Sequence, residues 1–120
     1  METFNVYKQK PIAERKIIYN KLKSQFPTKI FVIISLNNIP INTTNKITNK
    51  FIVDYETTVD KLIFNIRKEL IINENQAIFT YVNNNINVRM NSKIGNLYDI
   101  YKDKDDGFLY IMLCSENTFG

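Results

Sequence analysis

Few side chains in this sequence could carry out chemistry. The chain has no histidine and a single cysteine, Cys114, so it lacks the usual general base and cannot form an internal disulfide. Cys114 lies in an apolar segment, where we expect a buried structural thiol and not a nucleophile. The three glycines all lie beyond residue 94 and do not have the spacing of a phosphate-binding loop. We therefore expect neither an enzyme nor a cofactor.

A cluster of carboxylates resembles a metal loop only in part. Asp103, Asp105 and Asp106 stand close together in the sequence. A calcium loop of this kind also needs a bidentate glutamate further on, and none follows at the right spacing. We interpret the three aspartates as a solvated turn and expect no metal site.

Length, composition and charge point to one globular domain. The chain has 120 residues, of which 44% are hydrophobic, and no apolar run approaches the roughly 20 residues of a membrane span. The N-terminus has no secretory pattern, so we expect a soluble protein of the cytosol or nucleus. Residues 1–50 hold nine Lys and Arg against two acidic residues, and residues 51–120 hold seven against ten. The basic half indicates either an acidic partner or simply a solvated surface.

Three segments have helical patterns. Ile18, Leu22 and Phe26 recur four residues apart, which predicts one face of a helix. Thr58 suits the N-cap of a second helix, whose apolar residues recur at spacings of three and four: Val59, Leu62, Ile63, Ile66 and Leu70. Residues 94–101 predict a short third helix.

Four runs of apolar and β-branched residues have strand length; they are residues 30–36, 50–54, 77–82 and 107–113. Two strands on either side of a central helix predict an α+β fold of the ubiquitin-like β-grasp type. In it a four-stranded mixed sheet has one covered face, and additional helical sequence precedes it. We divide the chain into an N-terminal helical segment, a β-grasp core and a flexible tail, at residues 1–28, 29–114 and 115–120.

Several stretches resemble the autophagy-related ubiquitin-like modifiers, the family of the GABA-receptor-associated protein and the microtubule-associated protein light chains. Together they cover nearly the whole chain: ERK…FPTKIFVII at 14–34, KFIV at 50–53, TV…IRK at 58–68, AIFTYVNN at 77–84, IGNLY at 94–98 and DGFLYI…SENTFG at 106–120. The last is the most specific, because an aromatic residue and a terminal glycine follow the final strand. The resemblance implies two N-terminal helices, near residues 3–8 and 11–24.

The resemblance implies a conjugation cycle that ends at Gly120, with Phe119 beside it in the tail. The Gly120 carboxylate would be adenylated, passed as a thioester to cysteines of activating and conjugating enzymes, and joined to phosphatidylethanolamine. A terminal glycine has no Cβ, so the tail can enter a narrow enzyme channel. We expect a cytoplasmic protein, monomeric before conjugation and peripheral on the autophagosomal membrane, or on a relict plastid, afterwards.

The resemblance also implies capture of receptor and adaptor proteins through an aromatic-x-x-aliphatic motif, added as a strand along the second strand. Pocket one, for the aromatic residue, would be lined by Ile18, Leu22, Phe31, Lys50, Ile52 and Phe108. Pocket two, for the aliphatic residue, would be lined by Phe51, Val53 and Leu62. Lys29 and Lys50 would form a charged rim for acidic residues that flank the motif. These apolar residues could equally be ordinary core.

Five positions depart from the family pattern. Phe31 replaces a proline at pocket one. Four departures cluster around pocket two and place its peptide preference in question: Asp54 for proline, Thr57 for a larger aliphatic residue, Asn65 for an apolar one and Glu69 for a basic one.

Two other readings stay open. The first is the sister modifier, autophagy-related protein twelve, which is joined to a protein lysine. The N-terminal helical segment and the ENTFG tail favour the lipid-linked family. The second, of another class, is a small basic nucleic-acid-binding domain. We expect no nucleic-acid partner, because no strand interleaves basic and aromatic residues as a stacking platform requires.

Overall fold

The structure, a computed structural model, describes residues 7–40, 49–83 and 86–115. Its elements are α2 (Ile12–Gln25), β1 (Ile30–Asn37), β2 (Lys50–Val53), α3 (Val59–Leu70), β3 (Phe79–Val82), β4 (Ile86–Asn87), α4 (Ile94–Tyr101) and β5 (Leu109–Cys114). Tyr7 and Lys8 have helical backbone. The remainder of the helix expected near residues 3–8 lies outside the described residues.

The five strands form one mixed sheet in the order β2-β1-β5-β3-β4. β1 and β5 lie parallel at its centre, and the other neighbouring strands are antiparallel. This is the α+β arrangement of the β-grasp that the sequence predicts. It contains one strand more than expected, because β4 pairs Ile86 with Val82 and Asn87 with Tyr81.

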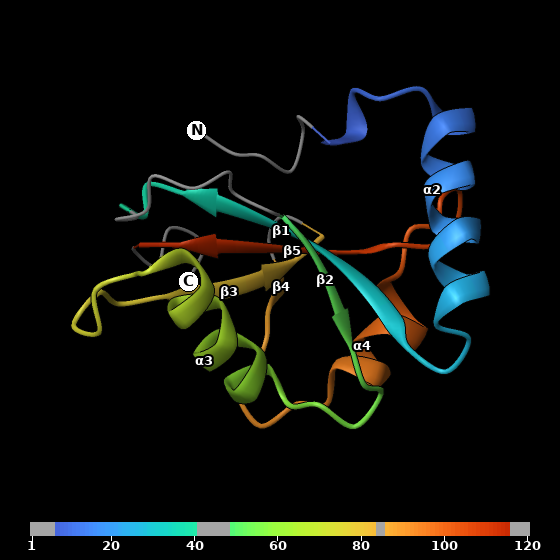
Figure 1. Cartoon of the computed structure of the whole chain (residues 1–120). Helices are drawn as coiled ribbons and strands as arrows, with labels where there is room; N and C mark the ends of the chain where they lie inside the picture. Colours follow the sequence, from blue (N-terminus) through green and yellow to red (C-terminus); the bar gives the residue numbers. More distant parts are fainter. Residues whose placement is uncertain (1–6, 41–48, 84–85, 116–120) are drawn as a thin grey trace.

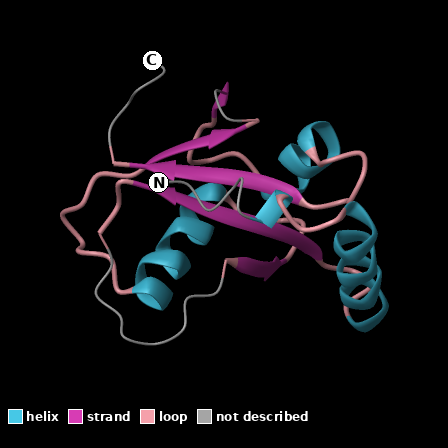
Figure 2. Cartoon of the chain, turned by 90° about the horizontal axis from the view of Figure 1, so that it is seen from above, coloured by secondary structure: helices cyan, strands magenta, loops and turns pink. Residues whose placement is uncertain are grey.

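α3 and α4 cover one face of the sheet (Figures 1 and 2). Their buried residues, including Leu62, Ile66 and Leu97, form one cluster with alternate residues of the central strands, such as Val32 and Ile111. Alternation places every second side chain of a strand on the same face. This cluster is the main core of the domain.

The opposite face of the sheet is covered too. Phe31, Ile33, Phe108 and Tyr110 form a second buried cluster together with Tyr7. The residues of α2 that pack against this cluster are Ile18, Tyr19 and Leu22. All of β5 is buried, as in strands that are covered on both faces. The expectation of one covered face was therefore wrong.

The ends of α3 follow from local sequence. The Thr58 hydroxyl accepts a hydrogen bond of 3.2 Å from the backbone N–H of Lys61, which confirms the predicted N-cap. Asp60 lies in the first turn, and Arg67 and Lys68 lie in the last. These charges complement the helix dipole. Ile71 ends the helix in the left-handed conformation, with a φ of 53°.

Candidate functional site

β2 lies at the edge of the sheet, so its outer edge has no neighbouring strand among the described residues. Its inner edge pairs with β1, which places Ile52 opposite Phe31 and Lys50 opposite Ile33. An unpaired edge offers backbone N–H and C=O groups to an added strand. Because side chains alternate along β2, Lys50 and Ile52 lie on the α2 face while Phe51 and Val53 lie on the α3 face.

The residues expected at pocket one come together on the α2 face. Phe31 and Phe108 belong to the buried cluster against which Ile18 and Leu22 pack. Phe31 is 1% exposed and Phe108 is fully buried, whereas Ile52 is 43% exposed. The two phenylalanines therefore form a floor, and Ile52 stands above it on the edge strand.

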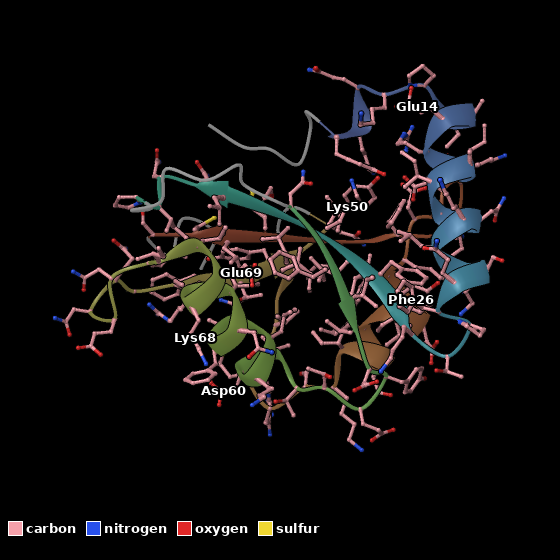
Figure 3. All side chains as sticks on the ribbon, in the orientation of Figure 1. Glu14, Phe26, Lys50, Asp60, Lys68 and Glu69 are labelled. Carbon is pink, nitrogen blue, oxygen red and sulfur yellow. The ribbon has the colours of Figure 1, made fainter. Side chains whose placement is uncertain are left out.

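Lys50 stands over the same cluster. Its Nζ atom lies 5.6 Å from the centre of the Tyr7 ring, within the range of a cation–π contact. Figure 3 shows Lys50 at the end of β2 that lies nearest the N-terminal segment. The ammonium group thus lies at the start of the edge strand, on the α2 face.

The residues expected at pocket two also share one face. Phe51 and Val53 are half-buried and pack against the main core, to which Leu62 belongs. Leu62 is 1% exposed, so it lies beneath the two strand residues and not at the surface. Asn65 and Glu69 of α3 are exposed, and they bring polar groups to this side of β2.

The expected charged rim is partly neutralised. The Lys29 ammonium forms an ion pair with the Asp54 carboxylate, and both side chains are substantially exposed. Asp54 is one of the departures from the family pattern. It therefore offsets the positive charge of Lys29 at one end of β2, while Lys50 carries positive charge at the other.

Asp106 was wrongly assigned to a solvated turn, because its side chain is 0% exposed. Its carboxylate accepts hydrogen bonds from Arg15 Nη1 at 2.7 Å, from the Tyr110 hydroxyl at 2.5 Å and from the backbone N–H of Phe108 at 2.9 Å. Burial and the hydrogen bond to Asp106 together raise the pKa of Tyr110 above its usual range. This network joins α2 to β5, and no pattern in the sequence predicted it.

Asp103 organises the turn before β5. Its Oδ1 atom accepts hydrogen bonds from the backbone N–H groups of Asp105 and Asp106, and Lys8 Nζ lies 3.0 Å from its Oδ2 atom. Burial raises the pKa of Asp103, but the hydrogen bonds from Lys8 and the two backbone groups outweigh it and hold that pKa below its usual value. Across the described ranges, no group of three or more acidic, cysteine or histidine side chains is arranged to hold a metal ion.

Two tyrosines that no sequence pattern indicated, Tyr7 and Tyr19, pack with the residues predicted for pocket one. The Tyr19 ring meets Phe31 and Phe108 edge-on at 5.6 Å and 5.4 Å, and its hydroxyl lies 2.5 Å from that of Tyr98. The Tyr7 ring meets Phe108 edge-on at 5.5 Å. Burial, with a smaller effect of Asp106, raises the pKa of Tyr7 to about 12. Neither tyrosine belongs to the residues that the family resemblance implied for pocket one, and the helical spacing of Ile18 and Leu22 does not include Tyr19.

β5 ends at Cys114, one residue beyond the strand predicted over residues 107–113. Cys114 is 1% exposed, which confirms the predicted buried thiol. Phe119 and Gly120 lie outside the described residues. In the ranges that are described, no helix is both long and apolar enough to span a bilayer.

Comparisons with known proteins agree with this arrangement. A family model described as autophagy protein Atg8, ubiquitin like, matches residues 14–120. The chain is 34% identical over 113 residues to an autophagy-related protein 8-like protein of Dictyostelium discoideum, covering 91% of this chain and 87% of the relative. It is 31% identical over 122 residues to autophagy-related protein 8D of Oryza sativa subsp. japonica, covering 94% and 99%.

A human relative is similar at the same level. The chain is 30% identical over 112 residues to microtubule-associated protein 1 light chain 3 gamma of Homo sapiens, which covers 93% of this chain and 76% of that protein. The family model and the three relatives each span most of the sequence, and the β-grasp sheet with its preceding helix fits them. The chain therefore belongs to the Atg8 family of ubiquitin-like autophagy proteins.

Proposed function

We propose that this protein is a modifier that is joined through the carboxyl group of Gly120 to phosphatidylethanolamine and marks an autophagy-related membrane. The carboxylate would attack the α-phosphorus of ATP, form an adenylate and release pyrophosphate. A thiol of a partner enzyme would then displace AMP and carry the acyl group as a thioester. The lipid amine would then form the amide and release the enzyme thiol. The buried Cys114 cannot take part in this transfer, because its sulfur is shielded from solvent. The reacting cysteines therefore belong to the partners.

We propose further that the attached protein recruits receptors and adaptors with an aromatic-x-x-aliphatic motif. The observation that carries this proposal is the edge position of β2, with the Ile52 side of the strand above an aromatic cluster and the Phe51 side above the main core. A peptide strand added there would pair its backbone with β2 and place side chains on both faces.

A reconstituted reaction tests the conjugation. The full chain would be incubated with activating enzyme, conjugating enzyme, ATP and liposomes that contain phosphatidylethanolamine, and the product would be weighed by mass spectrometry. We expect a gain equal to the lipid minus water. Deletion of Gly120 should abolish it and leave the unfolding transition unchanged, because β5 already ends at Cys114.

The substitution Glu116→Ala serves as the matched control in the tail and should keep full conjugation. Lipid attachment without Gly120 would contradict the proposal, and so would transfer to protein lysines in place of the lipid amine.

A further inference from the structure

Three acidic side chains stand near the peptide edge, and they differ in what they contact. Asp54 is paired with Lys29, and Glu56 is paired with Lys93 at 2.6 Å. Glu69 is exposed, and among the described residues its carboxylate has no ion-pair partner. Of these three carboxylates, Glu69 is thus the one left available to a cation from outside the chain.

Glu69 lies on the flank of α3 that faces the peptide edge. Leu62, Asn65 and Glu69 are spaced by three and four residues, which places them in one row along the helix. Leu62 belongs to the core against which Phe51 and Val53 of β2 pack. Figure 3 shows Glu69 on the side of α3 nearer β2 and Lys68 on the side turned away.

The pleat of an added strand decides which peptide residue meets this flank. Successive side chains of a strand point to opposite faces. Suppose that the aromatic residue enters pocket one on the α2 face. The first residue after it then points to the α3 face, and the second residue after it points to the α2 face. The third, aliphatic residue again points to the α3 face, at pocket two. This alternation holds whichever way the peptide runs along β2.

We infer that Glu69 selects peptides with a lysine or arginine directly after the aromatic residue. The inference rests on the proposed peptide capture. Two peptide residues share the α3 face: the one directly after the aromatic residue, and the aliphatic residue. The aliphatic residue covers Phe51, Val53 and Leu62. The residue directly after the aromatic lies beside it on that face, along the row of α3 that ends at Glu69. An aspartate or glutamate in this place would face a like charge. The basic rim at Lys50 and the acidic flank at Glu69 together favour motifs with acidic residues before the aromatic and a basic one after it.

Calorimetric titration of the full chain with three synthetic peptides tests this. Each peptide has two glutamates before a tryptophan, a leucine three residues after it and alanine elsewhere. The first carries lysine directly after the tryptophan, the second carries aspartate there, and the third carries lysine one position later. We expect the first peptide to bind with a dissociation constant about five-fold lower than that of the second. This is the difference expected when an exposed pair of opposite charges is replaced by a pair of like charges.

Two variants assign the preference to one side chain. Glu69→Lys should reverse the order of the first two peptides. Glu74→Lys makes the same change of charge at an exposed position beyond α3 and should preserve the order. The third peptide should respond equally to both variants, since its lysine points to the α2 face.

The outcomes separate the inference from the function on which it rests. If the unaltered chain prefers the second peptide, or if the preference for the first survives Glu69→Lys, the inference is overturned while peptide capture stands. If none of the peptides binds, peptide capture and the inference both fail.

Discussion

The guanidinium group of Arg15, on α2, lies 2.7 Å from the carboxylate of Asp106, in the turn before β5. The Asp106 side chain is 0% exposed and that of Arg15 is 12% exposed, so solvent screens this ion pair only weakly. A buried carboxylate needs such a partner to remain charged. Because α2 also carries Ile18 and Leu22, this ion pair helps to hold against the sheet the helix that carries two of the residues predicted for pocket one.

Arg15→Ala should lower the free energy of unfolding by about 3–5 kcal/mol, because it leaves the Asp106 charge buried and unpaired. Denaturant titration followed by circular dichroism measures the loss. Lys10→Ala is the matched control, since it breaks the exposed pair with Glu14 and should cost less than about 1 kcal/mol. Similar losses from the two variants would show that the Arg15 pair is no stronger than a surface pair.

The lowered pKa of Asp103 predicts an acid-dependent contribution to stability. Its ordinary pKa is 3.8, and the folded value lies below this, so the contribution is fully present above pH 3.8 and is lost as the pH falls through the folded value. Asp103→Asn should therefore destabilise the protein by about 1 kcal/mol at pH 7, and the difference should shrink below pH 4. Unfolding curves of both proteins at pH 7, 4 and 3 measure this. A difference that stays constant with pH would assign the effect to geometry and not to charge.

Tyr7→Phe should leave the free energy of unfolding at pH 7 unchanged, or raise it by up to about 1 kcal/mol. The Tyr7 hydroxyl is buried without a hydrogen-bond partner among the described residues, and removing such a group relieves its desolvation cost. Tyr110→Phe should instead cost about 2 kcal/mol, because it deletes the hydrogen bond to the buried Asp106.

The same Tyr7 variant should also change how the stability of the protein falls at alkaline pH. The pKa of Tyr7 is raised from 10.0 to about 12, so the stability linked to its proton is fully present below pH 10 and is lost between about pH 10 and 12. Thermal melts across this range should show a shallower decline for Tyr7→Phe than for the unaltered chain. Parallel declines would mean that other groups govern the alkaline transition.

Lys50→Glu should weaken binding of an acidic aromatic-x-x-aliphatic peptide about ten-fold, because it replaces an attraction at the start of β2 with a repulsion. Lys21→Glu changes the net charge equally at an exposed position of α2 and should have little effect. Fluorescence anisotropy with a labelled peptide measures both. Equal weakening would indicate general electrostatics and remove the support for strand addition at β2.

Local patterns in the sequence were enough to predict α3 and the central strands. The spacing from Val59 to Leu70 and the cap at Thr58 are both properties of neighbouring residues, and the structure confirms them. β4 was missed because its pairing involves only Ile86 and Asn87, which is too short to show alternation.

The parts of the site that depend on contacts between residues far apart in the sequence were harder to predict. α2 gives a mixed pattern, since Ile17 is 66% exposed while the polar-tipped Tyr19 packs inward. Arg15 and Asp106 are 91 residues apart, and charged residues usually lie at the surface. Nothing in the neighbouring sequence therefore marked Asp106 as buried. The residues of the two pockets came from family resemblance, and their binding role stays a prediction.

The parallel pairing of β1 with β5 has a consequence for synthesis on the ribosome. β1 lies near the start of the chain, but its central neighbour runs from Leu109 to Cys114, and a strand that lacks this partner cannot close the sheet. Contacts so distant along the chain form late. A nascent chain that stops short of Leu109 would expose its apolar strands and be open to degradation. The central pairing of the sheet can therefore form only after β5 has been synthesised and has left the ribosome.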